Sequence, residues 1–285
     1  MGLVKGLINS KIYISLAAVF LTIETQIQLG LEPQWHPYLF IIFFATLFEY
    51  NLHQLVIIVT NKGALKPNKY SWVKKNMKVF YGLTILSMIG FISVIFMAKK
   101  EVLITFAPMA AITFLYSIPL FVNKRKFFRL REIPYLKIFL IAFVWTFSTI
   151  FLPVIQSDCE FNKVHVIAML VERFFFIFAI TIPFDIRDKE ADKQAGLKTI
   201  PLLFTENKSY IISYLFLLIF FLVSVFHYQI PNQRFIILSI SISTVTTFIF
   251  LYSKKIRNFN LYHYGILDGT MLLQGLLVLL FYYMN

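Results

Sequence analysis

Residues 164–201 read VHVIAMLVERFFFIFAITIPFDIRDKEADKQAGLKTIP, so that an apolar run leads directly into a group of aspartates. The run Val164–Phe184 matches the roughly 20 residues that a helix needs to cross a bilayer. Asp185, Asp188 and Asp192 follow it at i, i+3 and i+7, which puts the three carboxylates on one face if the helix continues. We therefore predict a membrane-spanning helix that ends in an acidic face.

The composition extends this prediction to the whole chain. Of 285 residues, 59% are hydrophobic and only 14% are charged, and the mean hydropathy is +0.74, whereas soluble globular proteins carry roughly a quarter charged residues. Soluble globular, disordered and nucleic-acid-binding classes are therefore excluded. A single cysteine, Cys159, excludes an internal disulfide and CxxC metal sites. The sequence also has no HExxH pair and no glycine-rich phosphate loop.

Apolar blocks of similar length recur along the chain with short loops between them. A helix satisfies its own backbone hydrogen bonds in hydrocarbon, so each block predicts a membrane helix. We expect an all-α, polytopic bundle of about nine transmembrane helices that forms one domain over residues 1–285. The nine blocks are Lys11–Leu29, Pro37–Thr60, Val79–Met97, Val102–Val122, Ile138–Ile155, Val164–Phe184, Tyr210–Tyr228, Phe235–Tyr252 and Tyr262–Met284.

The basic residues alternate sharply between successive loops. The N-terminus and the even-numbered loops hold 22 Lys and Arg residues, the odd-numbered loops hold 4, and Arg173 lies within a block. The positive-inside rule then puts the N-terminus and the even-numbered loops in the cytoplasm, with the C-terminus outside. The net charge of +13 is thus mostly a signal of membrane topology, and a nucleic-acid partner is not expected. We predict a multi-pass protein of a bacterial-type cell membrane.

The aspartates after the sixth block have two interpretations. Stacked like charges repel, and a divalent cation resolves the conflict, because Mg²⁺ takes one or two carboxylates, keeps waters and completes its shell with phosphate oxygens. This favours a Mg²⁺–diphosphate site at the membrane surface. The alternative is a solvated loop of mixed charge, since Arg187, Lys189 and Lys193 alternate with the aspartates.

Two motifs resemble a known family. Asp188-Lys-Glu-Ala-Asp192, followed by Gly196, Thr199 and Pro201, resembles the second aspartate-rich motif of the UbiA superfamily of intramembrane prenyltransferases. Nine spans with the acidic motif after the sixth are also similar to the family arrangement. A weaker match is Tyr116-Ser117-Ile-Pro119 with the basic residues Lys124, Arg125 and Lys126.

The resemblance implies a function. Mg²⁺ held by two acidic motifs would grip an isoprenyl diphosphate, and the prenyl group would pass to a lipid-soluble acceptor, an aromatic or quinone-precursor compound, inside the bilayer. Asp188 and Asp192 would be the principal Mg²⁺ ligands and Asp185 a supporting one. The candidate substrate-binding residues are Asn51, Lys62, Lys66, Tyr116, Lys124, Arg125, Lys126, Arg173 and Arg187.

The chain departs from the family at the first acidic motif, N-x-x-x-D-x-x-x-D after the second span. Asn51 matches its asparagine, but Leu55 and Val59 stand where the aspartates belong. Neither side chain can bind a cation, which questions the transferase activity.

Two replacements for the lost motif are conceivable. Glu49 and His53 are i, i+4 neighbours and can offer a carboxylate and an imidazole to one metal ion. Alternatively, the lysines of residues 61–78 hold the diphosphate directly, with Lys62 and Lys66 nearest the membrane. A structural alternative is that the polar side chains of this segment only hydrogen-bond neighbouring helices.

Charged residues inside the spans are the remaining candidates. Glu172 and Arg173 lie mid-span, where Arg173 either contacts substrate or forms a salt bridge to another helix. Glu24 and Asp268 are its possible partners, or else groups that orient an acceptor.

The main prediction is therefore a Mg²⁺-dependent prenyltransferase of the membrane. The first alternative is a non-catalytic family relative that binds prenyl lipid or a partner, which the lost aspartates favour. A transporter ranks last, because the polar residues collect at the cytoplasmic ends of the spans and not at mid-membrane on broken helices. The sequence identifies no protein partner.

Overall fold

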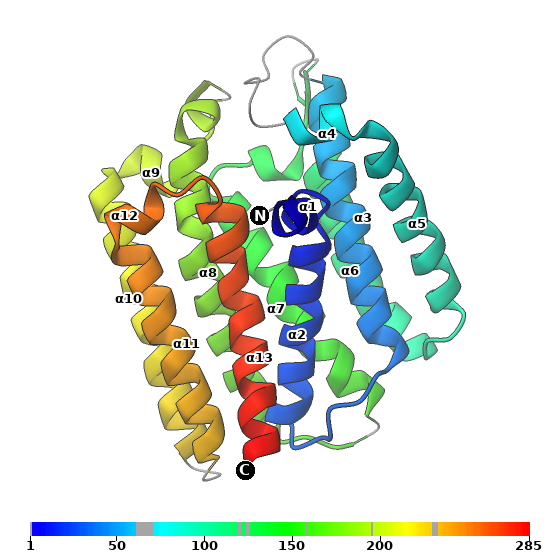
Figure 1. Ribbon diagram of the computed structural model, residues 1–285, viewed down its shortest axis with the longest axis vertical. Coiled ribbons are helices and arrows are strands. Elements are labelled where there is room, and N and C mark those ends of the chain that lie inside the picture. The colour runs from blue at the N-terminus through cyan, green and yellow to red at the C-terminus, as the bar shows by residue number, and fades with distance from the viewer. Residues whose placement is uncertain are drawn as a thin grey trace.

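Long apolar helices run up and down through the molecule (Figure 1). The computed structural model describes residues 2–60, 71–118, 121–123, 126–157, 159–194, 196–229 and 233–285. A short helix, α1 (Gly2–Asn9), lies across the bundle near one of its ends. The long helices are α2 (Ile12–Gln28), α3 (Pro37–Thr60), α5 (Met77–Ile95), α6 (Lys100–Ser117), α7 (Leu136–Gln156), α8 (Lys163–Gln194), α10 (Glu206–Gln229), α11 (Arg234–Tyr252) and α13 (Asp268–Met284).

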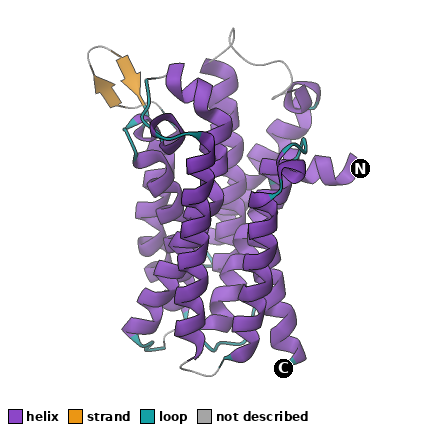
Figure 2. Cartoon of the chain, turned by 90° about the vertical axis from the view of Figure 1, so that its left-hand side faces the viewer, coloured by secondary structure: helices purple, strands orange, loops and turns teal. Residues whose placement is uncertain are grey.

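Short elements join these helices. A two-stranded antiparallel hairpin of β1 (Phe121–Asn123) and β2 (Lys126–Phe128) pairs Phe121 with Phe128 and projects beyond the bundle (Figure 2). The sequence did not predict this hairpin. The other short elements are α4 (Ser71–Lys75), the 3₁₀ turn η1 (Leu130–Glu132), α9 (Ile200–Leu203), α12 (Lys254–Arg257) and the π-helical turn η2 (Tyr262–Leu267).

The predicted all-α membrane fold is confirmed. Within the described residues, seven helices are long and apolar enough to cross a membrane. The helix α2 is apolar but has 17 residues, and α6 has 18 residues with Pro108 inside it. Each of the nine predicted blocks corresponds to one long helix, α13 being preceded by the turn η2. Nine membrane crossings and a cytoplasmic N-terminus stay predictions.

Two block boundaries differ from the prediction. The fourth block was expected to run to Val122, but α6 ends at Ser117 and Ile118 is already extended, with φ −98° and ψ 134°. Proline disfavours helical geometry in the residue before it, and position 119 is a proline. The sixth block was expected to end near Phe184, whereas α8 continues to Gln194 and carries the whole acidic motif.

Successive helices pack side by side and close into a ring. The helix α2 contacts α3, α3 contacts α6, and the order continues through α7, α8, α10, α11 and α13, which returns to α2. The helix α5 packs on the outer side of α3 (Figure 1). The most buried candidate span is α8, with 67% of its apolar window inside the molecule. The acidic motif is thus attached to the most buried of the candidate spans.

At Gly275 the helix α13 lies directly against the backbone of α2. A Cβ atom at Gly275 would overlap the backbone of Phe20, whereas a Cβ at Gly82, on α5, would meet nothing within 4 Å. Small residues let membrane helices approach closely.

We expect Gly275→Ala to destabilise the protein by about 1–3 kcal/mol, the usual effect of forcing atoms into a packed site. Gly82→Ala is the matched control and should leave stability equal or slightly raised, because alanine favours helix. Thermal unfolding of both variants in detergent checks this. Equal midpoints for the two variants would contradict the packing account.

Candidate functional site

The three predicted aspartates lie on the last turns of α8, at what we call the acidic end of the bundle. Asp185 and Asp192 are buried, and both contact the same cation. The Nζ atom of Lys137 lies 2.8 Å from Asp185 Oδ1 and 3.0 Å from Asp192 Oδ2. The expected common face is therefore present for these two residues, and the ammonium of α7 relieves their repulsion.

Asp188 has a different partner. Arg187 donates from Nε to Oδ1 at 2.9 Å and from Nη2 to Oδ2 at 2.7 Å, a two-point contact between neighbours. The same guanidinium lies over the ring of Tyr264, 4.8 Å from its centroid, and over that of Phe184 at 5.1 Å. Arg187, predicted to bind substrate, is thus directed toward η2 and Asp188.

A hydrogen-bonded chain occupies the place of the missing first motif. Arg131 of η1 lies 3.0 Å from Nε2 of His53, and Nδ1 of His53 lies 3.1 Å from the hydroxyl of Ser117. Ser117 in turn donates to Glu49. A guanidinium only donates, so Nε2 accepts, Nδ1 carries the proton and the chain runs Arg131→His53→Ser117→Glu49. A metal ion on His53 would have to displace Arg131.

Asn51 lies in the same turn of α3 and is fully buried. Neither its amide nitrogen nor its amide oxygen has a hydrogen-bond partner among the residues that the structure describes. A buried polar group without a partner costs about 1–3 kcal/mol, so a bound ligand that supplies donors and acceptors would be stabilised here. Leu55, one turn further along α3, offers no ligand atom.

Tyr116 stands between the two sides of the acidic end. Its hydroxyl is within electrostatic reach of Lys137 and Arg131 on one hand and of Asp185 and Asp188 on the other. Its ring centroid lies 6.0 Å from that of His53. These groups of α3, α6, α7 and α8 therefore form one polar cluster. On its basic rim, burial of the guanidinium, followed by the charge of Arg131, lowers the pKa of Arg129.

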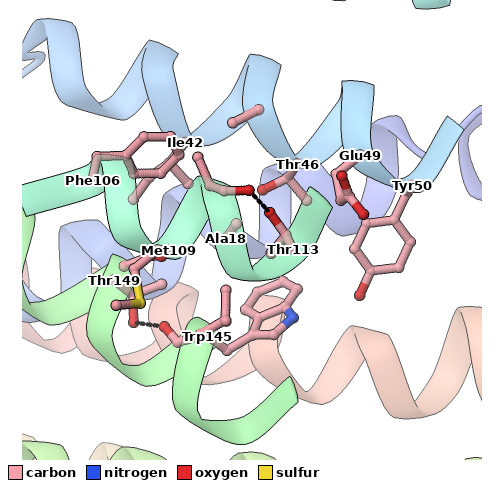
Figure 3. Close-up of a pocket in the computed structure, with 14 residues that line it drawn as sticks. Ala18, Ile42, Thr46, Glu49, Tyr50, Phe106, Met109, Thr113, Trp145 and Thr149 are labelled. Carbon is pink, nitrogen blue, oxygen red and sulfur yellow. Dashed lines mark hydrogen bonds between the residues drawn. The ribbon is translucent and has the colours of Figure 1, made fainter. Parts of the chain in front are cut away.

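A cavity of about 80 Å³ lies between α2, α3, α6 and α7. Its wall is mostly apolar, and Figure 3 shows Glu49 and Tyr50 at one end of it and Phe106 toward the other. Glu49 therefore belongs both to the cavity wall and to the hydrogen-bonded chain that leads to Arg131. A wider hollow of about 320 Å³ opens at the opposite end of the bundle, away from the acidic motif.

Several predicted residues cannot be placed. Lys62, Lys66, Lys124 and Arg125 lie outside the described residues, and of Lys126 only the backbone, in β2, is described. Sequence reasoning in turn missed Lys137, Ser117 and Arg131 as site residues. Lys137 was counted as a loop charge, although its place just before an apolar block was a signal that it begins a helix.

Arg173 lies apart from this cluster. Its guanidinium is 3.4 Å from Glu24 and donates to the carbonyl of Leu21 at 2.9 Å. Gln274 also donates to Glu24, at 2.9 Å. The predicted interhelical salt bridge is therefore present, with Glu24 as its acid. Thr149, which accepts a hydrogen bond from Arg173 at 3.4 Å, also lines the cavity and so connects the ion pair to the cavity wall.

The residues present fit one Mg²⁺ ion better than two. Oxygen ligands on one helix face suit Mg²⁺, which needs only one or two carboxylates beside phosphate and water. Across the described ranges, however, no three His, Cys, Asp or Glu side chains form a ready metal site, and Glu49 and His53 are not grouped with Asp188. A second ion would find no free carboxylate on α3.

The fold and the cluster define an integral membrane protein with a charged site over an apolar intramembrane cavity. The UbiA prenyltransferase family matches residues 73–261, which include the acidic motif and Lys137 but not the first-motif region. The chain belongs to this family. A comparison with curated protein sequences gives no match.

Solved structures share the fold. A UbiA homologue from Archaeoglobus fulgidus bound to GPP and Mg²⁺ superposes with TM-score 0.62 at 15% identity, covering 95% of this chain and 99% of that one. The apo UbiA homologue from Aeropyrum pernix K1 gives TM-score 0.65 at 10% identity, with 96% and 98% covered. A digeranylgeranylglyceryl phosphate synthase gives TM-score 0.57 at 15% identity, with 95% and 98% covered.

The buried pair of Arg173 and Glu24 yields a prediction on stability. Arg173→Met leaves the Glu24 charge uncompensated in the bundle, so we expect a loss of about 3–5 kcal/mol. Adding Glu24→Gln to Arg173→Met should restore much of it, because both charges are then gone. Thermal unfolding in detergent measures both variants. A double variant no more stable than Arg173→Met would show that the charge pair is not the cause.

Proposed function

We propose that this protein transfers a prenyl group from an isoprenyl diphosphate to a lipid-soluble acceptor within the membrane. The observation that carries the proposal is the joint position of Glu49. Its carboxylate lines the apolar cavity and ends the hydrogen-bonded chain from Arg131, so a charged cluster suited to a diphosphate adjoins a space suited to a prenyl chain. Family membership supports the same activity.

The donor lies with its diphosphate at the acidic end and its prenyl chain in the cavity. The homologues from A. fulgidus bound to GPP and to DMAPP with Mg²⁺ support this class of donor. The unpartnered amide of Asn51 is available to a diphosphate oxygen or a water of the bound cation. Because the basic loops predict the topology, we place the acidic end in the cytoplasm, where soluble diphosphates are at hand.

Mg²⁺ fits at Asp188, with Asp192 and Asp185 in support. When bound, the ion neutralises charge on the diphosphate and stabilises it as a leaving group. The carboxylate of Asp188 pairs with Arg187 and is 23% exposed, so it is open to an ion from solvent. The protein's own residues position the donor around that ion.

The bond changes are simple. The allylic C–O bond breaks with its electron pair left on the diphosphate oxygen, while lysine and arginine side chains stabilise the growing negative charge. The electron-rich carbon of an aromatic acceptor then forms the new bond to the prenyl carbon and loses its proton. Glu49 is the carboxylate in the cavity wall that can take this proton. Tyr50 and Trp145 give the cation aromatic faces, and the mostly apolar cavity wall disfavours water.

The acidic motif can be tested directly. We expect the wild-type protein in detergent with Mg²⁺ to release diphosphate from at least one of a panel of allylic diphosphates given aromatic acceptors. Asp188→Asn with Asp192→Asn should lower this rate by about 100-fold or more, as for other groups that stabilise transition-state charge. Thermal unfolding of the double variant checks that its fold is intact.

The alternative is a family relative that binds prenyl diphosphate without chemistry, which the apolar residues Leu55 and Val59 at the first-motif positions favour. Donor binding with no product on any acceptor would support this alternative. Turnover equal to that of the aspartate double variant, on every donor, would remove the transferase proposal.

The cavity gives a second test. Ala110 lines the cavity from α6, whereas the neighbouring Ala111 is exposed on the outer surface. Ala110→Phe should fill the space and weaken binding of a prenyl diphosphate by about tenfold or more, while Ala111→Phe should leave it unchanged. Binding of a radiolabelled donor in detergent measures both, and equal affinities would show that the prenyl chain lies elsewhere.

A further inference from the structure

Lys137 occupies an unfavourable place for a lysine. It is the second residue of α7, where the helix dipole repels positive charge. Its side chain is only 12% exposed. The turn before it is fixed, since Tyr135 has a left-handed backbone with φ 65° and donates its N–H to the carbonyl of Lys198, just after α8. The chain therefore holds this ammonium against the end of α8.

The ammonium sits where a bridging cation would sit. It joins Asp185 and Asp192, which are two turns apart on α8, with contacts of 2.8 Å and 3.0 Å. A lysine has three N–H donors. Among the described residues, Lys137 donates a hydrogen bond to Asp192 and forms an ion pair with Asp185, so a donor remains for a further oxygen. An incoming diphosphate supplies such an oxygen.

A second fixed cation faces it. Arg131 is attached through His53 and Ser117 to Glu49, in the region where the family resemblance led us to expect two aspartates. The turn η1, which carries Arg131, packs against α7, which carries Lys137, and both cations interact electrostatically with the Tyr116 hydroxyl. Together they carry two positive charges, the charge of one divalent ion. The loss of two ion-binding aspartates is thus matched by two cations that are part of the chain.

We infer that Lys137 and Arg131 form a fixed dicationic site for the diphosphate of the donor, in place of one of two divalent ions. The inference rests on the proposed function and specifies how its donor is held. Lys137 gives its third N–H to a diphosphate oxygen while Asp185 and Asp192 keep the ammonium in place. The guanidinium of Arg131 binds a second oxygen. Donor binding then persists without any divalent cation, and the single ion at Asp188 serves the bond-breaking step.

The test is binding of a non-hydrolysable donor, geranyl thiolodiphosphate, to the full chain in detergent, with excess EDTA or with saturating Mg²⁺. Wild type should bind in EDTA. Lys137→Met and Arg131→Met should each bind about tenfold or more weakly in EDTA, the loss expected for one hydrogen bond between charged groups. Lys137→Arg should keep most of the affinity. Lys193→Met, which removes an exposed lysine next to Asp192, is the matched control and should bind as wild type does.

Folding is controlled separately. Lys137→Met leaves two buried carboxylates without their cation, so Lys137→Met with Asp185→Asn is also measured, and thermal unfolding identifies any variant that has lost its structure. Arg131→Met breaks no buried ion pair in the described part of the chain and tests the site independently.

The outcomes separate the two proposals. If wild type binds the analogue only with Mg²⁺, or if Lys137→Met and Arg131→Met bind it in EDTA as wild type does, the dicationic site is wrong while the prenyltransferase proposal stands. If wild type binds the analogue in neither condition and releases no diphosphate from any allylic donor, the proposed function itself fails. Metal-free binding that both substitutions weaken, with Lys193→Met unchanged, supports the inference.

Discussion

The contact of Lys137 with Asp185 and Asp192 is the interaction on which the acidic end depends. Charges in a membrane bundle are stable only beside an opposite charge, because the surroundings screen them poorly. Three aspartates on one helix face would repel each other and fray the last turns of α8. With the ammonium between two of them, α8 continues as one helix to Gln194 and the start of α7 is fixed against it. This contact fixes three features: the helical form of the acidic motif, the turn at Tyr135 and the position of the polar cluster over the cavity.

The same constraint organises the opposite side of the cavity. Arg173 of α8 forms an ion pair with Glu24 of α2, and His227 of α10 hydrogen-bonds Glu172 of α8. The pair of Arg173 and Glu24 joins two helices that are distant along the chain. Thr149 lines the cavity and accepts a hydrogen bond from Arg173, so its hydroxyl lies between the ion pair and the cavity.

Much of the fold could be predicted from the sequence, because the bilayer forces each long apolar block to be a helix. The common face of the acidic motif could also be predicted, because the spacing of its aspartates puts them on one face if the helix continues. The side chains that contact the acidic motif could not be predicted. Which cation meets Asp185 is decided by how α7 lies against α8, and although the sequence places Lys137 at the start of a helix, it does not show which residues Lys137 contacts. Arg131 and Ser117 reach His53 only because η1 and the end of α6 come together, and no local pattern records that meeting.

The departure at Leu55 and the basic side chains around it are best understood together. Removing acidic ligands from one side of a diphosphate site lowers its affinity for cations and so for the diphosphate that they bind. In the proposed dicationic site, a lysine and an arginine fixed by the fold supply positive charge without recruiting an ion from solution. Each of the two side chains carries one positive charge, and its position is set by carboxylates or by His53. These side chains therefore cannot adjust their positions around the ligand as a hydrated metal ion adjusts its coordination. Such a site should therefore depend more on the geometry of α7 and η1 than on the ionic composition of the solvent.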